Sequence, residues 1–321
     1  MSDRTPTRRR FLQASSAIAG AALLPGLATA ASSSGWQSVE TPTGTTLHDV
    51  EATAAGAYAV GGGGVVLERT DAGWRTVLDG GPTGNGNSLY GADVTDDGEC
   101  LWFVGASGAI GEYDVTTGDL TDHSAPMDVT NNFNDVSVTG AAGEANVYVA
   151  GDSGKVYYSF ENGASQTWEY VTPGSGSAIN AVDFYDDRKG HIVDGNKSVF
   201  STVDGATWDE LGIADANVNF YGVDSDGADD VWVSGGGGTV VHWNGSQWTP
   251  ADTGDAGLRD IEVAPAGDAG YTVGGGGKLY AVEDGRWVQQ STPTGQNLKA
   301  VVRAGLDADV AVGAGGTVVE K

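Results

Sequence analysis

The chain has 321 residues, 52 of them glycine, and a formal net charge of −27. This charge disfavours nucleic acid as a partner, because the phosphate backbone is itself anionic. Glycine at about twice its ordinary frequency is typical of folds with many tight turns rather than long helices, and the single cysteine, Cys100, excludes an intramolecular disulfide.

The first thirty residues are predicted to be an export signal. The segment Thr7–Gln13 resembles the twin-arginine motif, with Arg8 and Arg9 as the paired arginines. The apolar run Ala17–Leu24 is shorter than the ~20 residues that span a bilayer, and small residues predict cleavage after Ala30. We therefore expect residues 1–30 to be removed, and 31–321 to be an exported domain, extracellular or at the cell surface, without a stable membrane span. Retention of the signal as an anchor is the alternative.

The acidic character increases when the signal is removed. Residues 1–30 carry Arg4, Arg8, Arg9 and Arg10 but a single acid, Asp3. The remaining acids are spread along the chain rather than clustered, as a patch for a basic partner would require. Self-repulsion of this size is tolerable where salt screens it, since the Debye length is about 3 Å at 1 M. The composition indicates a protein from a halophile.

Three sequence markers recur in the same order along residues 36–321. The first is a large apolar residue followed three positions later by a small or β-branched one, and it starts at Leu47, Leu89, Phe133, Ile179, Phe220, Leu258 and Leu298. The second is a glycine that ends an apolar run, at Gly61, Gly105, Gly151, Gly195, Gly235, Gly274 and Gly313. The third is a closing tryptophan, at Trp74, Trp168, Trp208, Trp248 and Trp287. Seven units at a spacing of roughly 38–46 residues are typical of four-stranded propeller blades.

The fifth unit illustrates the predicted blade, with strands at Phe220–Val223, Val231–Ser234, Thr239–Trp243 and Gln247–Pro250. Glycine clusters such as Gly235–Gly238 resemble phosphate-binding loops. No helix follows them to provide a dipole, so tight turns with positive φ are the better interpretation.

The two ends of the repeat array are complementary. The seventh unit, Leu298–Lys321, stops before any tryptophan, while Trp36–Val39 precedes the first unit and belongs to no blade. In the second unit, Leu120 stands where other units have tryptophan. We predict an all-β, seven-bladed β-propeller whose last blade is closed by the N-terminal strand, which would remove exposed sheet edges.

The repeats also resemble a known group. The segments Ile179–Phe184, Gly195–Asn196 and Ser201–Trp208 are similar to photosystem II stability/assembly-factor propellers and to the wider Asp-box, sialidase-type repeat class. Val203 stands where that class has aspartate, and Asp204 follows it. The resemblance covers about residues 36–321 and implies the fold more specifically than the function.

Sialidase-type propellers, as the resemblance implies, use three converging arginines. Only one arginine of residues 31–321, Arg259, is expected to face the channel; the others are Arg69, Arg75, Arg188, Arg286 and Arg303. A sialidase-like or other carbohydrate-active hydrolase is therefore the alternative rather than the leading hypothesis.

Metal and cofactor chemistry has weak signals. The four histidines lie in different units without metal-ligand spacing. Asp224, Asp226 and Asp229 form an acidic stretch that could suit a hard cation, although a plain β-turn is favoured. No cofactor is predicted.

The residue after each apolar start is expected near the channel, at His48, Tyr90, Asn134, Asn180, Tyr221, Arg259 and Lys299. Tyr90, Tyr221, Asn134 and Arg259 are the predicted binding residues, because aromatic and arginine side chains dominate interface energies. The leading hypothesis is an exported, non-enzymatic scaffold that binds an unknown protein or surface polymer. A structural cell-surface repeat protein is a further alternative.

Overall fold

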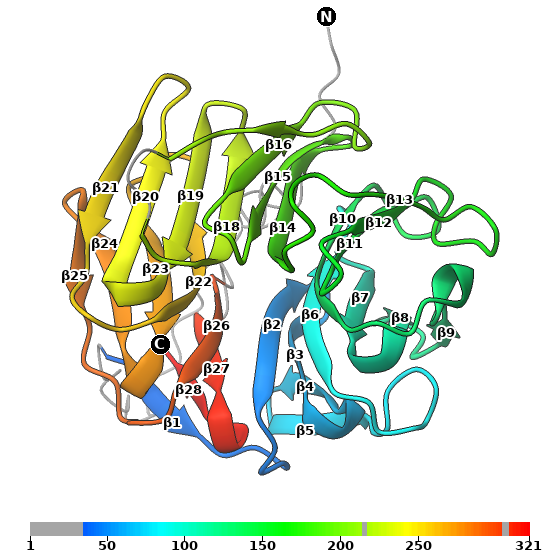
Figure 1. The fold of residues 1–321 in the computed structure, drawn as a ribbon. Helices are drawn as coiled ribbons and strands as arrows, with labels where there is room; N and C mark the ends of the chain where they lie inside the picture. Colours follow the sequence, from blue (N-terminus) through cyan, green and yellow to red (C-terminus); the bar gives the residue numbers. More distant parts are fainter. Residues whose placement is uncertain (1–34, 214–216, 304–307) are drawn as a thin grey trace, which may run out of the picture.

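The structure is a computed structural model that describes residues 35–213, 217–303 and 308–321. Arg8, Arg9 and the cleavage site after Ala30 lie outside the described residues. Seven four-stranded antiparallel sheets surround a central axis, and Figure 1 shows them as successive blades. The described residues contain no helix long and apolar enough to cross a membrane.

Each blade is a meander whose first strand is innermost. Blades 1 and 2 consist of β2 (Leu47–Thr53), β3 (Gly56–Gly61), β4 (Val66–Thr70) and β5 (Gly73–Leu78), then β6 (Leu89–Val94), β7 (Cys100–Gly105), β8 (Ile110–Asp114) and β9 (Leu120–Asp122). Blades 3 and 4 consist of β10 (Phe133–Thr139), β11 (Asn146–Gly151), β12 (Val156–Ser159) and β13 (Glu169–Val171), then β14 (Ile179–Asp186), β15 (Lys189–Asp194), β16 (Val199–Thr202) and β17 (Asp209–Glu210). Blades 5 and 6 consist of β18 (Phe220–Gly227), β19 (Asp230–Gly235), β20 (Thr239–Trp243) and β21 (Trp248–Asp252), then β22 (Leu258–Val263), β23 (Gly270–Gly274), β24 (Leu279–Glu283) and β25 (Arg286–Gln289). Blade 7 consists of β26 (Leu298–Val302), β27 (Val310–Gly313), β28 (Val318–Glu320) and β1 (Gln37–Val39).

The predicted closure is confirmed. Strand β1 pairs antiparallel with β28, with Gln37 opposite Glu320 and Val39 opposite Val318. Trp36, just before β1, is buried and meets Tyr271 of blade 6 edge to face, with ring centroids 5.3 Å apart. The N-terminal strand therefore supplies both the missing strand of blade 7 and an anchor in the neighbouring core.

Apolar side chains fill the seams between blades. At the seam between blades 7 and 1, Leu67 and Trp74 pack with Val312 in one buried cluster. Glu320 of β28 adds polar contacts there, because it accepts from Arg69 Nε at 2.7 Å and from Trp74 Nε1 at 2.8 Å. The seam that joins the two ends of the chain is thus held by packing and by an ion pair.

The glycine clusters form tight turns between the second and third strands, as predicted. In the turn Gly236–Gly238 (η4), Gly237 has φ 63° and Gly238 has φ 71°. A Cβ on Gly238 would lie 2.3 Å from the carbonyl oxygen of Gly254. Both the backbone conformation and the close approach require glycine.

The fourth strands depart from the expected pattern in detail. In blade 5 this strand begins at Trp248 and ends at Asp252 rather than covering 247–250. In blade 4 the Asp-box-like turn is built on Asp204, whose Oδ1 accepts from the backbone N–H groups of Ala206 and Thr207 at 2.9 and 2.7 Å. These bonds lower the pKa of Asp204 to about 2, while the preceding Val203 is 72% exposed.

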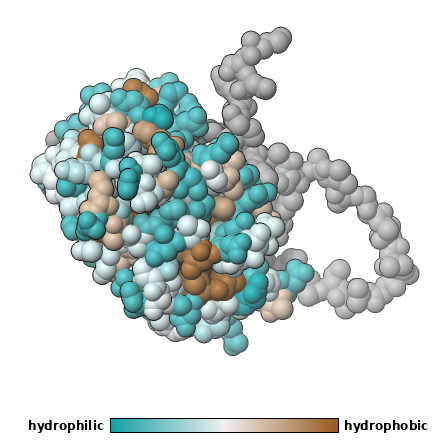
Figure 2. Space-filling model, turned by 90° about the vertical axis from the view of Figure 1, so that its right-hand side faces the viewer, coloured by the Kyte–Doolittle hydropathy of each residue, from teal (hydrophilic) through white to brown (hydrophobic). Residues whose placement is uncertain are grey.

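Figure 2 shows one face of the molecule, which is largely hydrophilic, with one larger compact hydrophobic group and smaller hydrophobic spots elsewhere. Large exposed hydrophobic side chains come from different blades and loops, at Leu120, Met127, Tyr170, Val203 and Val288. Such scattered residues are ordinary for a soluble surface.

Candidate functional site

Every innermost strand carries a β-bulge at its second residue. In blade 1 the pairing passes from Leu47 opposite Gly61 directly to Asp49 opposite Val60, so His48 has no partner. Bulges of this kind re-aim a side chain out of the regular ladder. The same shift in the other six blades leaves out Tyr90, Asn134, Asn180, Tyr221, Arg259 and Lys299. We call these seven residues the bulge ring.

Neighbouring members of the bulge ring interact around the channel. His48 meets Tyr90 at 90°, with ring centroids 5.2 Å apart. The guanidinium carbon of Arg259 lies 4.2 Å from the centroid of the Tyr221 ring. The charge of Lys299 acts on His48, and that of Arg259 acts on Lys299. The structure therefore places Tyr90, Tyr221 and Arg259 at equivalent bulge positions of their blades.

The two asparagines of the ring hold adjacent blades together. Asn134 Nδ2 donates to the carbonyl oxygen of Ile179 at 2.9 Å, and Asn180 Nδ2 donates to that of Phe220 at 2.6 Å. Asn134 was predicted as a binding residue, but its amide nitrogen already makes a hydrogen bond across the seam between blades 3 and 4. Its contribution to a ligand would therefore come from the carboxamide oxygen and the second N–H of the amide group.

Burial and like charges set the protonation of the basic members. Burial, and then the nearby Lys299, lower the pKa of His48 to about 4. Burial, and then Arg259, lower the pKa of Lys299. At neutral pH His48 is therefore uncharged, while Arg259 carries a full positive charge beside Lys299.

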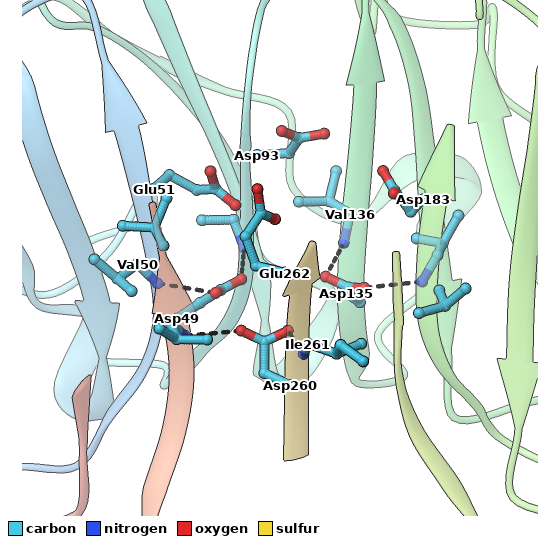
Figure 3. Close-up of a pocket in the computed structure, with 15 residues that line it drawn as sticks. Asp49, Val50, Glu51, Asp93, Asp135, Val136, Asp183, Asp260, Ile261 and Glu262 are labelled. Carbon is cyan, nitrogen blue, oxygen red and sulfur yellow. Dashed lines mark hydrogen bonds between the residues drawn. The ribbon is translucent and has the colours of Figure 1, made fainter. Parts of the chain in front are cut away.

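A narrow, acidic cavity of about 70 Å³ is lined by residues of the innermost strands that follow the bulge positions. Figure 3 shows carboxylates from several blades directed into it. We call them the acid ring: Asp49, Glu51, Asp93, Asp135, Asp183, Asp260 and Glu262. The other lining residues are alanine, valine and isoleucine.

The aspartates bond backbone N–H groups of two adjacent blades. Asp49 accepts from the N–H of Val50 at 2.8 Å and from that of Ala92, in blade 2, at 2.7 Å. Asp135 repeats this with Val136 at 2.9 Å and with Val182, in blade 4, at 2.8 Å.

Four further seams, those between blades 2 and 3, 4 and 5, 5 and 6, and 6 and 7, each have an aspartate that reaches into the next blade. In each case a backbone N–H donates to the carboxylate: Val138 to Asp93, Ser225 to Asp183, Val263 to Asp224 and Val301 to Asp260. The innermost strands are sheet edges, and their inward N–H groups need acceptors. The carboxylates supply those acceptors, so these aspartates link and complete the sheets.

The acid ring holds protons more strongly than exposed carboxyl groups do. Burial raises the pKa of Asp49 and Asp135 well above the usual value, and the other ring carboxylates add to the shift. Burial also raises the pKa of Asp260 to about 6. These shifts follow from placing several carboxyl groups in one cavity without a basic lining residue.

The acidic stretch proposed as a cation site is dispersed. The carboxylate of Asp224 accepts from Val263 N–H at 2.8 Å, which ties it to a seam. Asp226 lies on β18 and Asp229 lies in the following turn. Within 35–213, 217–303 and 308–321, no three His, Cys, Asp or Glu side chains are placed to hold a metal ion.

The arginines expected of a sialidase-type site are also dispersed. Arg69 pairs with Glu320 and Arg75 with Glu68. Arg188 lies over the ring of Phe160, with its guanidinium carbon 3.6 Å from the centroid. Among these arginines and Arg259, only Arg259 belongs to the bulge ring.

The comparisons with known proteins agree with this architecture. No protein-family model matches the chain, and no curated protein matches it. The structure is similar to YCF48 from Cyanidioschyzon merolae, with a TM-score of 0.70, 16% identity and coverage of 89% of this chain and 98% of that one. Similarity to YCF48 bound to D1 peptide has the same TM-score at 14% identity, with coverage of 89% and 94%. Virginiamycin B lyase from Staphylococcus aureus matches with a TM-score of 0.75, 13% identity and coverage of 89% and 98%. These similarities establish a β-propeller fold.

Proposed function

We propose that this chain is a non-enzymatic scaffold that binds a partner protein through the bulge ring. The observation that carries this proposal is the repeated bulge. Seven equivalent positions place chemically varied side chains at one end of the channel, among them Tyr90 and Tyr221. The next positions hold only glycine, alanine or an aspartate that links two blades. Variation is thus concentrated where a partner can be contacted, and aromatic side chains are frequent interface anchors.

The structural neighbours support a binding role at the level of the fold. One neighbour is YCF48 in complex with a D1 peptide, and another is a chain of a mitotic checkpoint complex. Propellers of this shape therefore serve as protein-binding platforms. For this chain, a protein partner is a proposal that rests on the side chains of the bulge ring.

An enzyme is the second candidate, because one neighbour is named as virginiamycin B lyase, and the resemblance of the repeats gave a carbohydrate-active hydrolase as the alternative. Glycoside hydrolysis needs a carboxyl pair with access to the sugar. Here Asp49 and Asp135 accept backbone N–H groups, and the cavity that they line is about 70 Å³. Those features favour a structural role for the acids. Steady turnover of aryl glycosides by purified protein would promote the enzyme hypothesis instead.

Export and a saline environment are part of the same proposal. The twin-arginine-like segment around Arg8 and Arg9 supports export, and the net charge of −27 supports adaptation to high salt. The partner would then lie outside the cytoplasm or at the cell surface.

The decisive experiment compares partner capture by three purified proteins. These are the exported protein, its Tyr90→Ala/Tyr221→Ala double variant, and a Tyr170→Ala control. Tyr170 is 53% exposed and lies on the outermost strand of blade 3. We expect the double variant to lose captured partner, as measured by quantitative mass spectrometry, with its melting temperature nearly unchanged. Equal capture by all three proteins would refute a role for the bulge ring.

A further inference from the structure

Three neighbouring members of the bulge ring form a basic arc: Arg259 in blade 6, Lys299 in blade 7 and His48 in blade 1. The chain has 43 acidic residues against 16 lysines and arginines. Even so, the ion pairs in the described part of the chain do not include Arg259 or Lys299. The two like charges belong to adjacent blades, and burial, followed by the charge of Arg259, lowers the pKa of Lys299. Such an arrangement is unfavourable until an anion neutralises it.

The acids nearest in sequence are already engaged. Asp260 follows Arg259 directly, and its carboxylate accepts from the N–H groups of Ile261 and Val301, both at 2.8 Å. Asp49 follows His48 and likewise accepts two backbone N–H groups. Burial also raises the pKa of Asp49 and Asp260, which favours their neutral forms. These two neighbouring aspartates are therefore engaged with the backbone rather than with the basic arc.

The aromatic members of the ring flank the arc on both sides. Tyr221 lies against Arg259, and Tyr90 lies against His48. A guanidinium stacked on an aromatic face keeps its N–H edges available for an oxyanion. Arg259 is exposed, so those edges are open to solvent. The arc therefore combines an open bidentate donor, a second cation and apolar ring surfaces.

We propose that the basic arc is a subsite for a carboxylate, the side chain of an Asp or Glu of the partner protein next to an aromatic or apolar residue. Arg259 and Lys299 bind the carboxylate, and Tyr221 packs against the neighbouring apolar side chain. This inference rests on the proposed function, because it specifies what the bulge ring recognises. An acidic segment would otherwise be repelled by a protein of net charge −27, so the arc also limits binding to this place.

The test uses a matched pair of peptides, N-acetyl-Phe-Glu-amide and N-acetyl-Phe-Gln-amide, titrated into the exported protein by NMR at low salt. The Glu peptide is expected to bind at least fivefold more tightly than the Gln peptide. Arg259→Gln and Lys299→Gln should each weaken the Glu peptide at least fivefold. Arg286→Gln, on the outermost strand of the same blade, should leave binding unchanged. Equal binding of the two peptides, or equal weakening by Arg286→Gln, would overturn the subsite.

The ring of His48 provides a second readout that a structural role would not affect. Its pKa of about 4 is set by burial and by Lys299. The imidazole also contacts the Tyr90 side chain, and Asp49 follows it in the sequence. Carboxylate bound beside Lys299 should raise the pKa of His48, and the Gln peptide should not. An unchanged His48 titration in the presence of saturating Glu peptide would contradict the assigned place of binding.

The two proposals can fail separately. If Tyr90→Ala/Tyr221→Ala abolishes partner capture while both charge variants retain capture and peptide binding, the carboxylate subsite is wrong and the scaffold function stands. If the Glu peptide binds as expected but the tyrosine variant captures partner normally, the proposed function fails and the subsite remains.

Discussion

Replacing Trp36 tests whether the N-terminal strand closes the ring. Its side chain is 3% exposed and packs with Tyr271, Val273 and Leu279 of blade 6 and with Val319 of blade 7. Truncating a buried tryptophan to alanine costs about 3–5 kcal/mol. For a chain of this size, Trp36→Ala should lower the melting temperature by roughly 6–15 °C.

Two companion variants separate closure from general loss of packing. The indole N–H of Trp36 has no acceptor among the described residues. Trp36→Phe therefore leaves no polar group unsatisfied, and we expect it to retain most of the stability. Trp287 occupies the outermost strand of blade 6 but is only half-buried, so Trp287→Ala should cost less than Trp36→Ala.

The assay is equilibrium unfolding in molar salt, followed by tryptophan fluorescence and circular dichroism. Deletion of Trp36–Val39 should be at least as destabilising as Trp36→Ala, because it also exposes the edge of β28. The reasoning is refuted if the deletion variant and the intact protein melt at the same temperature.

The remaining predictions concern the acid ring, pH, salt and export. Asp135→Ala leaves two backbone N–H groups without their acceptor and should cost about 2–6 kcal/mol in urea unfolding, whereas the exposed Asp255→Ala should be nearly neutral; equal costs would exclude the seam-linking role. The pKa of Asp260 is raised to about 6 from a usual value of 3.8, so its stabilising contribution is complete below pH 4 and is lost as pH rises through 6. The melting temperature should therefore fall between about pH 4 and pH 6, and Asp260→Asn should flatten that slope; an identical slope in the variant would exclude the assignment. With a net charge of −27, the melting temperature should rise steeply from low to molar salt, and a flat profile would contradict the high-salt interpretation. Lysine at both Arg8 and Arg9 should abolish secretion, and mass spectrometry of the wild-type secreted protein should find Ala31 at its N-terminus rather than Met1.

The repeat markers predicted the fold because each one has a fixed structural cause. The apolar start fills a seam, and the glycine after the second strand is followed by a turn that needs positive φ. The unmatched Trp36 and the incomplete seventh unit predicted closure, since a blade without its fourth strand leaves an open edge. The alignment also gave Tyr90, Tyr221 and Arg259 equivalent positions, because the bulge occurs at the same offset in every blade, but it did not indicate that members of the ring would contact one another.

The acid ring was not predicted, although a signal for it exists. Acids stand two or four positions after the apolar start, as at Asp49, Asp93, Asp135 and Asp260. In a chain with 43 acidic residues, these positions could not be distinguished from solvent-facing ones. Their role depends on the inward N–H groups of the next blade, and that pairing becomes visible once adjacent strands are placed in space.

The repeated bulge places two kinds of residue next to each other on the same strand. A bulged residue such as His48 has no partner in the strand pairing. On either side of it, Leu47 packs in a seam and Asp49 bonds the next blade. Mutations at the bulge positions other than Asn134 and Asn180, which bond the next blade, can therefore change what the ring recognises at small cost to folding. A lineage of such propellers could diversify its partners one blade at a time while each intermediate remains folded.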